Sequence, residues 1–520
     1  MHAFAALVVA VLLLVAAPAR AEWREASSPQ FIIYADANES WLRRFADKLE
    51  RFDGALRLLQ KIPDRRQEIA SNRLVIYIVP GGDRATALCG KGCGSVAGFY
   101  LPRAGNAVAF SARNDSGGEW DISSDVVLFH EYTHHLAASH FTRPYPRWFG
   151  EGFAEFYSTA RVDRDGSVGI GYAAQHRAYG LIEGTTIPIE RLIDPPRRAH
   201  AEFWDAFYGR SWMLTSMLMS STERANQLNR YLALIAEGKP NLTAAREAFG
   251  DLKALDRDIT AALRKPLKGL RVKADAIAVG ATTLRVLTPG EAAMMPVRLR
   301  SDRGVDRAQA LALVPDARRR ATPHLNDARV QAMLAEVEYD AGNDAEAEAA
   351  ADRALAADPG NLDAMLYKGR VLLRRATAKA SDAAMLKAAR VWFVRANRRD
   401  PNAAEPLMLN FGSYAWAGIR PTPNAVEGLL RAVELSPHAQ ELRFMAGVQM
   451  LNDDRPKEAR ALLLPLAFDP HGRGSANVAQ QMVEGIDKGE KASDILRGLP
   501  IVTLPAADGG GIDVPPKTVS

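Results

Sequence analysis

The chain has 520 residues, of which 48% are hydrophobic and 24% are charged. This length predicts several domains, and the composition is that of globular proteins with full cores rather than of disordered or disulfide-stapled chains. The formal net charge is only +5, from 66 basic and 61 acidic residues. No dense run of Lys and Arg alternates with aromatic residues, which disfavours nucleic-acid binding.

The first 21 residues have the pattern of a cleavable signal peptide. Residues 4–17 are almost wholly apolar, and Ala19-Arg20-Ala21 then places small residues at the two positions recognised for cleavage. The apolar run is shorter than the ~20 residues that cross a bilayer, although the weak n-region leaves a membrane anchor as the alternative. We therefore expect a mature chain that begins at Glu22 and is periplasmic or secreted.

Residues 22 to about 120 predict a small mixed α/β unit. β-branched and aromatic residues form short runs bounded by Gly and Pro, which is typical of strands. One longer segment has apolar residues at three-and-four spacing, which predicts an amphipathic helix. In chain order, the expected elements are a strand over 31–35, a helix over 39–60, and strands over 74–79, 98–101 and 106–110.

The chain has two cysteines, Cys89 and Cys93, close together in a glycine-rich stretch. In an oxidising compartment such a pair can form a disulfide. Two thiols alone fall short of the four ligands of a structural zinc site. We therefore expect a disulfide, with two free thiols as the alternative.

From residue 123 on, the pattern turns helical, with Ser123 or Ser124 as the expected first N-cap. Residues 266–304 return to short β-like runs broken by Pro289 and Gly290, and we interpret them as a linker or small β-like connecting module. The helices expected before this module cover residues 125–139, 147–159, 203–220 and 223–236.

The chain from about residue 325 is rich in Ala and Leu and is repetitive. Prolines at positions 359, 401, 437 and 470 follow Asp or Ser at intervals of 42, 36 and 33 residues, near the ~34-residue period of tetratricopeptide repeats. We expect helical repeats over 305–490 and a flexible tail over 491–520, with a generic Ala-rich bundle as the alternative. Small residues that let paired helices approach stand at Ala335, Gly342, Ala347 and Ala354.

His130-Glu131-Tyr132-Thr133-His134 is an H-E-x-x-H motif. Two histidines four apart on a helix point from one face and can bind one metal ion. Catalytic zinc takes three protein ligands and keeps a fourth position for water. Glu131 directly follows the first ligand and is close enough to take the proton of that water, so it is the expected general base. The preceding residues are apolar, so a buried helix with a metal is favoured over merely packed or solvated histidines.

The third ligand is expected on the helix that follows a loop containing Pro144 and Pro146. Glu151 and Glu155 are four apart, so they share a face of that helix. One of them can bind the metal, and the other can accept the second ring N–H of a ligand histidine. Aromatic residues surround both glutamates, which disfavours a plain solvated face.

His-Glu-Tyr-Thr-His followed by Trp-Phe-Gly-Glu-Gly-Phe-Ala-Glu-Phe resembles the gluzincin metallopeptidases, in particular their peptidase-MA-like bacterial members. It is also similar to the aminopeptidase N family. The resemblance covers about residues 120–220 and more loosely extends from residue 31. It implies Glu151 as the third metal ligand and Glu155 as the acid behind a ligand histidine.

The resemblance also implies a residue that stabilises the oxyanion. Phe207-Tyr208-Gly-Arg-Ser is similar to the segment in which aminopeptidase N relatives keep a tyrosine for this role. Tyr208 is therefore the expected hydrogen-bond donor, against the alternative of a tyrosine that only packs on its helix. His200 and His176 are weaker candidates, whereas His135 and His140 are interpreted as ordinary residues.

One family feature is missing, because the chain has no Gly-x-Met-Glu-Asn segment. Aminopeptidase N relatives use that segment to hold the free amine of the substrate, so an endopeptidase is favoured. The strand expected over 106–110 lies where the segment would be. We expect that this strand can bind an extended peptide by edge pairing.

The sequence therefore predicts an α+β zincin-like metallopeptidase domain over 22–265, followed by an all-α tetratricopeptide-like helical repeat array. The expected activity is zinc-dependent hydrolysis of peptides or proteins with one Zn2+ per chain. The repeats offer a surface for a protein partner. The alternatives are a catalytically silent scaffold whose repeats bind partners, and a zinc hydrolase acting on a different substrate such as an epoxide.

Overall fold

The computed structural model describes residues 22–63, 71–90, 97–113, 123–141, 143–184, 186–196, 199–265, 269–378, 382–468, 474–498 and 517–518. The expected signal peptide, Cys93 and Pro470 lie outside these residues, so the predictions for them stay predictions. Cys89 is disulfide-bonded. Within the described ranges, no helix combines the length and the apolar character needed to cross a membrane.

A mixed sheet forms the base of the N-terminal region, with the strand order β10-β4-β5-β3-β2-β1-β9. β2 pairs with β3 and β3 with β5 in parallel, whereas the other neighbours are antiparallel. The central strand β3 is buried along almost its whole length, which its unbroken apolar sequence predicts. The strands are β1 (Trp23–Ser27), β2 (Phe31–Asp36), β3 (Leu74–Pro80), β4 (Gly98–Leu101), β5 (Val108–Arg113), β9 (Thr283–Val286) and β10 (Lys517–Thr518).

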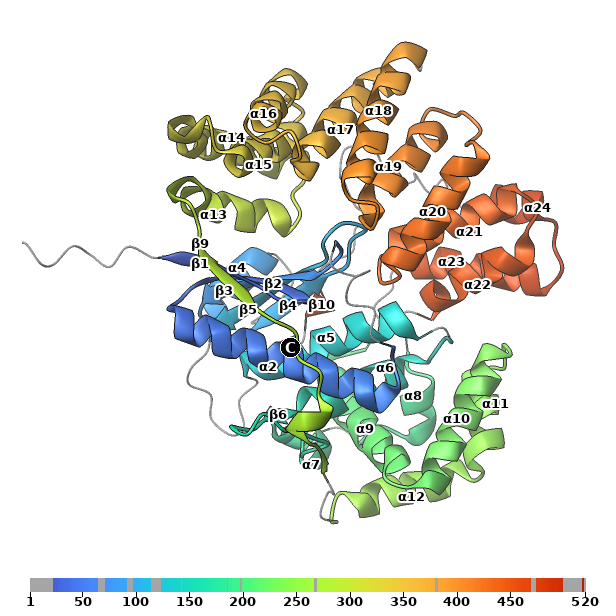
Figure 1. The fold of residues 1–520 in the computed structure, drawn as a ribbon. Coiled ribbons are helices and arrows are strands. Elements are labelled where there is room, and N and C mark those ends of the chain that lie inside the picture. The colour runs from blue at the N-terminus through green and yellow to red at the C-terminus, as the bar shows by residue number, and fades with distance from the viewer. Residues whose placement is uncertain are drawn as a thin grey trace, which may run out of the picture.

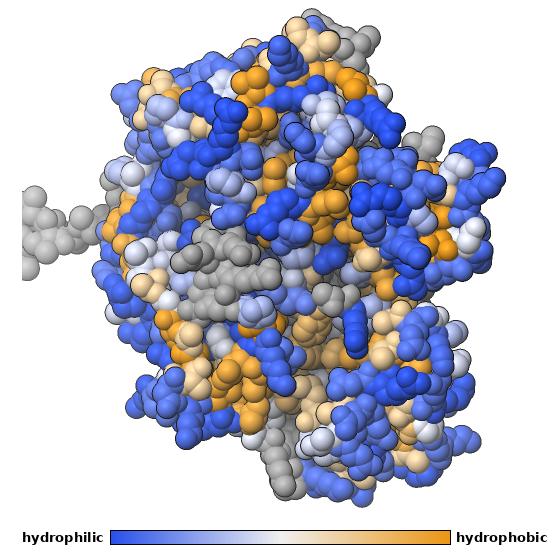
Figure 2. All heavy atoms as spheres, turned by 45° about the vertical axis from the view of Figure 1, so that its right-hand side comes forward, coloured by the Kyte–Doolittle hydropathy of each residue, from blue (hydrophilic) through white to orange (hydrophobic). Residues whose placement is uncertain are grey.

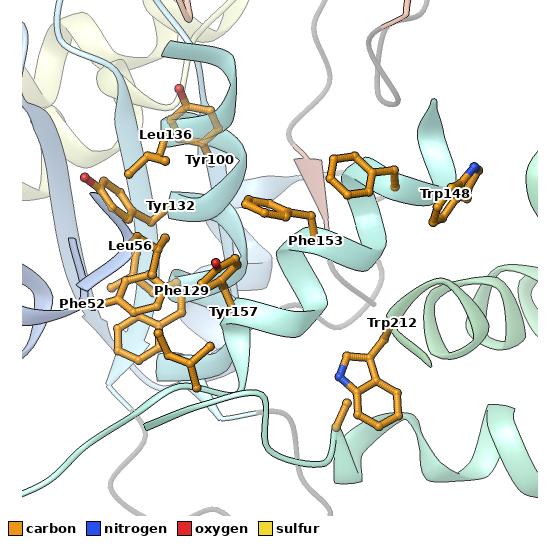
Figure 3. Close-up of a cluster of buried hydrophobic side chains, with 14 of the residues drawn as sticks. Phe52, Leu56, Tyr100, Phe129, Tyr132, Leu136, Trp148, Phe153, Tyr157 and Trp212 are labelled. Atoms are coloured by element: carbon orange, nitrogen blue, oxygen red, sulfur yellow. The ribbon is translucent and has the colours of Figure 1, made fainter. Parts of the chain in front are cut away.

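Helix α2 (Glu39–Gln60) covers one face of the sheet and also packs on helix α5 (Ser124–His140) (Figure 1). Phe52 of α2 stacks on Phe129 of α5 with ring centroids 4.0 Å apart (Figure 3). The ring centroid of Tyr132 of α5 lies 5.0 Å from that of Phe31. These aromatic contacts fix the rotation of α5. His130 and His134 therefore point from a different side of α5 than the side that packs on α2.

The rest of the N-terminal region is mainly helical, apart from a small sheet of β6 (Arg161–Val162), β7 (Val168–Ile170) and β8 (Leu270–Val272). The surface drawn in Figure 2 is mostly hydrophilic, with hydrophobic residues in separate patches. The helices are α4 (Gly82–Cys89), α6 (Arg147–Ser158), α7 (Ala178–Ile182), α8 (Ile189–Ile193), α9 (Ala201–Met219), α10 (Thr222–Ala236), α11 (Asn241–Phe249) and α12 (Leu252–Ala262), with a short 3-10 helix η1 (Gln175–Arg177).

The strand expected over 106–110 is β5, but it is an inner strand. β5 pairs with β3 on one side and with β4 on the other. The expectation that it binds an extended peptide by edge pairing is therefore wrong, because both of its edges already carry a neighbour. The hairpin through the turn at 102–105 places β4, not β5, toward the outer side of the sheet.

Helical hairpins form the C-terminal region. The predicted ends are confirmed: Asp358, Asp400 and Ser436 are the C-cap residues of α16, α18 and α20. Ala347 and Ala354 are fully buried, as the close approach of paired helices requires. The predicted fold class, an α+β region followed by an all-α array, is confirmed. The helices are α13 (Pro289–Asp302), α14 (Arg307–Ala321), α15 (Ala328–Asp340), α16 (Asp344–Ala357), α17 (Leu362–Ala378), α18 (Ala383–Arg399), α19 (Ala404–Ala415), α20 (Pro423–Leu435), α21 (Gln440–Asn452), α22 (Pro456–Ala467), α23 (Gly474–Asp487) and α24 (Ala492–Arg497).

The stretch 266–304, expected as a linker or β-like module, also holds helix α13. Pro289 and Gly290 do not simply break strands here, because they start this helix. Thr288 and Glu291 form a capping box around its first turn, and proline fits the first helical position. At the other end, α24 lies within the stretch 491–520 that was expected as a flexible tail.

The helical array arches over the sheet and contacts the N-terminal region (Figure 1). The side-chain amide of Asn72 donates to the carbonyl of Asn402 at 2.7 Å and accepts from the Ala404 N–H at 3.2 Å. The Ala104 N–H donates to the Glu441 carboxylate at 2.6 Å. Ala104 also belongs to an apolar core made by α19 to α21. The two regions thus share both hydrogen bonds and a core.

Candidate metal centre

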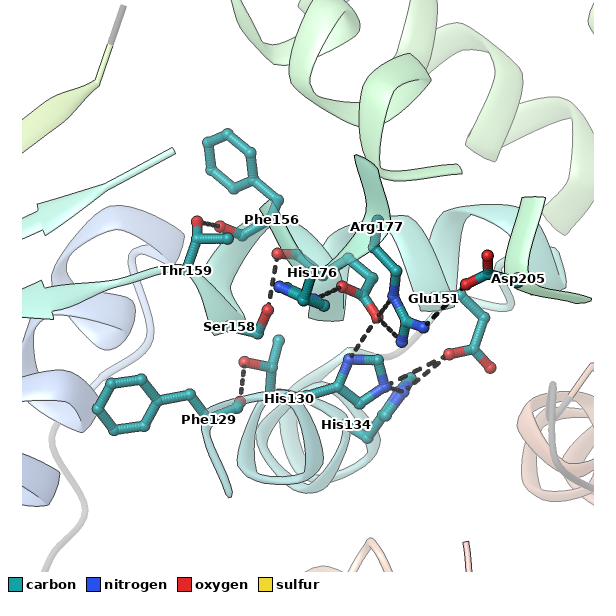
Figure 4. A network of polar contacts seen from close by, with 12 residues as sticks. Phe129, His130, His134, Glu151, Phe156, Ser158, Thr159, His176, Arg177 and Asp205 are labelled. Atoms are coloured by element: carbon teal, nitrogen blue, oxygen red, sulfur yellow. Dashed lines mark hydrogen bonds and ion pairs between the residues drawn. The ribbon is translucent and has the colours of Figure 1, made fainter. Parts of the chain in front are cut away.

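Two neighbouring helices carry the candidate ligands. The hydroxyl of the N-cap residue Ser123 caps the first turn of α5, and His130 and His134 lie one helical turn apart on this helix. Both imidazoles are turned toward Glu151 of α6 (Figure 4). Helix α6 can lie close to α9 because Gly152 has no side chain, since a Cβ there would stand 2.2 Å from the Ser211 carbonyl oxygen.

His130, His134 and Glu151 form a buried triangle of donor atoms. The two Nε2 atoms are 3.1 Å apart, and Glu151 Oε2 lies 3.5 Å from His130 Nε2 and 3.3 Å from His134 Nε2. All three residues are buried, and Glu151 has no exposed surface. The residues predicted as metal ligands are therefore brought together around one point.

The size of this triangle fits one metal ion. Nitrogen and oxygen ligands about 2.0–2.1 Å from a tetrahedral zinc ion stand about 3.3 Å apart. The three separations in the protein lie between 3.1 and 3.5 Å. Two imidazoles and one carboxylate are also a donor set that zinc accepts with an open fourth position. The group can therefore hold a metal ion.

Glu155 lies behind His130, on the side away from Glu151. Its Oε1 is 3.4 Å from His130 Nδ1, so the two ring nitrogens of His130 face two different carboxylates. Such an acid fixes the orientation and tautomer of a ligand histidine. Glu155 thus lies where the sequence predicts an acid of this kind.

Two residues whose role here is not predicted from the sequence hold Glu155 in place. Arg177 donates from Nη2 and Nε to Glu155 Oε1 at 2.7 and 3.1 Å, and His176 Nε2 lies 2.9 Å from Glu155 Oε2. Both belong to the short η1 helix, more than twenty residues along the chain from Glu155. No local sequence spacing predicts this contact, because it depends on how the loop around β6 and β7 returns the chain to Glu155.

The carboxylates give the site a negative field. Burial alone would lower the pKa of His130, but Glu151 and Glu155 raise it to about 10. Burial alone would raise the pKa of Glu155, yet Arg177, His130 and His176 together hold it well below its usual value. Glu155 is therefore ionised. The carboxylates favour a cation at the point where the two imidazoles and Glu151 meet.

The remaining predicted residues lie at different distances from the triangle. The ring of Tyr208, on α9, is 6.4 Å from that of His130, and Arg177 lies over its face at 4.8 Å. Burial and the charge of Glu151 raise the pKa of Tyr208. Glu131 is buried and its charge acts on His130. His200, in contrast, is the exposed N-cap residue of α9.

Comparison with known proteins finds partial likenesses, all among solved structures. No protein-family model matches the chain, and no curated protein matches it. Among solved structures, a thermophilic TPR protein of Thermus thermophilus matches 38% of this chain and 100% of its own, at 19% identity and a TM-score of 0.32. A likeness this weak carries no information about the function of the chain.

Proposed function

We propose that the protein is a zinc-dependent peptidase whose metal site is formed by His130, His134 and Glu151. The observation that carries this proposal is the buried triangle of their donor atoms, with Glu131 next to the first ligand. Zinc is favoured over other metals because the donor set has two imidazoles, one carboxylate and three protein ligands in all. One zinc ion per chain is proposed.

Each residue of the site has a separate role in hydrolysis. A bound zinc ion supplies a Lewis acid that polarises the scissile carbonyl and lowers the pKa of water. Glu131 takes the proton of the attacking water and returns it to the leaving amine. Tyr208 donates its hydroxyl to the oxyanion, and its raised pKa keeps that hydroxyl protonated. Glu155 and Arg177 keep His130 in its ligand orientation.

The proposal includes a substrate class and a location. The lack of a Gly-x-Met-Glu-Asn segment favours cleavage within peptides over removal of single N-terminal residues. The N-terminal signal pattern favours a periplasmic or secreted protein. A scaffold without activity is disfavoured, because it would need neither the base Glu131 nor a buried tyrosine beside the ligands.

Proteolysis of an unstructured casein substrate by the wild type, Glu131→Gln and Tyr208→Phe proteins tests this proposal. Glu131→Gln should abolish cleavage, because the general base is lost while both histidines remain. Tyr208→Phe should lower kcat by about 100-fold, typical for the loss of one oxyanion donor. Bound zinc, measured on the same samples, should be unchanged in both variants. Wild-type protein that carries zinc but cleaves no peptide would contradict the proposed activity.

A further inference from the structure

A pocket opens at the metal site between the two regions of the chain. One wall comes from α5 and from the end of β4, and it includes His134 and Tyr100. The opposite wall comes from the helical array and includes Pro437, His438 and Arg443. A candidate metal ligand and residues some 300 positions later in the sequence therefore line the same space.

Direct contacts hold the array wall against α5. The His438 ring lies 4.4 Å from the ring of His135, and its Nδ1 is 3.4 Å from the Ser139 hydroxyl. The His135 Nδ1 in turn lies 2.8 Å from the Tyr100 hydroxyl of β4. His438 is almost fully buried in this contact. Residues of the helical array therefore form one wall of the pocket beside the candidate metal site.

Arg443 brings a positive charge to this pocket. Its Nε donates to the Pro437 carbonyl at 2.7 Å, which orients the guanidinium. Arg443 forms no ion pair with any residue that the structure describes. Other half-buried arginines of the array do have a carboxylate partner, as Arg370 has Glu405 and Arg374 has Asp344.

A half-buried arginine without an acidic partner is costly, because burial penalises its charge. Burial lowers the pKa of Arg443, and among the residues that the structure describes the nearby Tyr145 counteracts this effect. A guanidinium gains most from a carboxylate, which it can bind through two parallel hydrogen bonds. The surroundings of Arg443 therefore favour an anion that enters the pocket from outside.

We propose that Arg443 binds a carboxylate of the peptide substrate and so contributes to its selection. This inference rests on the proposed peptidase function, and it assigns part of the substrate site to the helical array. The carboxylate can be the free C-terminus of the peptide or an Asp or Glu side chain. Both sources present the same group to the guanidinium, so the experiment must distinguish them.

Peptide binding can be measured without turnover in a Glu131→Gln background. The probes are three N-terminally fluorescein-labelled pentapeptides: Ala-Ala-Phe-Leu-Ala with a free carboxylate, its C-terminal amide, and the amide of Ala-Ala-Phe-Leu-Glu. Fluorescence anisotropy should give about tenfold or tighter binding for a carboxylate-bearing peptide than for the neutral amide, as expected for a charged hydrogen-bond pair. Preference for the first peptide identifies a C-terminal carboxylate, and preference for the third identifies a side chain.

Adding Arg443→Gln should remove this preference and leave the affinity for the neutral amide unchanged, whereas Arg443→Lys should retain part of it. Arg420→Gln is the matched control, because Arg420 belongs to the same array but its side chain is 88% exposed. Equal binding of all three peptides, no binding of any, or a preference that survives Arg443→Gln would overturn the inference. Because binding is the readout, a failure of the proposed peptidase activity would appear separately, in the cleavage assay.

Discussion

Glu155 lies between a candidate metal ligand and a fully buried arginine. Its Oε1 faces His130 Nδ1 at 3.4 Å, and Arg177 donates two hydrogen bonds to the same oxygen. Arg177 is not itself one of the three candidate ligands, so its effect on the metal must pass through Glu155 and His130. It is therefore a positioning residue, and its contribution should appear in metal affinity.

Arg177→Gln should weaken zinc binding by about 10- to 100-fold, the usual cost of losing an outer-shell partner of a ligand. The zinc dissociation constant can be measured by competition with a chromophoric chelator. Arg191→Gln serves as the control, since Arg191 lies on the short helix α8 with an exposed side chain. An unchanged dissociation constant in Arg177→Gln would show that Glu155 does not depend on this arginine.

At the scale of single residues, the sequence predicts which side chains a helical period places together. His130 and His134 are four apart, as are Glu151 and Glu155, so their shared faces follow from the geometry of one helix. Arg177 could not be predicted in this way, because a loop and a strand pair separate it from Glu155. Its position depends on the tertiary fold and not on any local pattern.

Glu291 connects elements of both regions at the start of the array. It accepts hydrogen bonds from Arg285 of β9 at 2.6 and 2.8 Å and from Arg329 of α15 at 3.0 Å. Arg285 also binds Glu25 of β1 at 2.5 Å. Although burial opposes ionisation, these arginines and the Thr288 N–H lower the pKa of Glu291 to about 2.

Glu291→Gln should lower the free energy of unfolding by roughly 2 kcal/mol at pH 7, because charged hydrogen bonds are lost. Since the folded-state pKa lies below the unfolded one, this stabilisation is complete above about pH 5 and is lost as the pH falls toward about 2. Urea unfolding of wild type and variant between pH 7 and pH 3 measures the difference.

The difference between wild type and Glu291→Gln should therefore shrink below about pH 4.5. Glu39→Gln provides the control, since Glu39 forms an exposed pair with Arg43 and should change stability little at any pH. A difference that stays constant down to pH 3 would contradict the lowered pKa of Glu291.

Elements with a strong period are those that the sequence predicts best. The helix expected over 39–60 is α2 at the same bounds, and the steps at Asp358, Asp400 and Ser436 end hairpins of the array. The helix α13 is missed, because Pro289 and Gly290 look like breakers unless the capping box around them is recognised. The place of β5 is missed because strand order depends on pairing across the whole sheet.

At the scale of the whole molecule, the array and the N-terminal region should unfold together. Asn72 is 2% exposed, and its amide bonds to both Asn402 and Ala404 across the junction. The apolar core that contains Ala104 also crosses the junction. The sequence could not predict this docking, because its contacts join residues more than 300 positions apart.

Asn72→Ala should lower the free energy of unfolding by roughly 2–4 kcal/mol, because one buried and one part-buried backbone group lose their partners. Calorimetry should show a single unfolding transition for the wild type, and the variant should unfold at a lower temperature or in two steps. Asn241→Ala is the control, since the side chain of Asn241 donates an exposed hydrogen bond to Asp194. Two independent transitions already present in the wild type would contradict the shared core.

The measurement that tests the metal site most directly is zinc content by mass spectrometry on purified protein. The wild type and Glu131→Gln should each carry about one zinc ion per chain, whereas Glu151→Ala should carry almost none. Glu183→Ala, which changes an exposed glutamate, should match the wild type. No zinc in the wild type after reconstitution, or full zinc in Glu151→Ala, would contradict the proposed site.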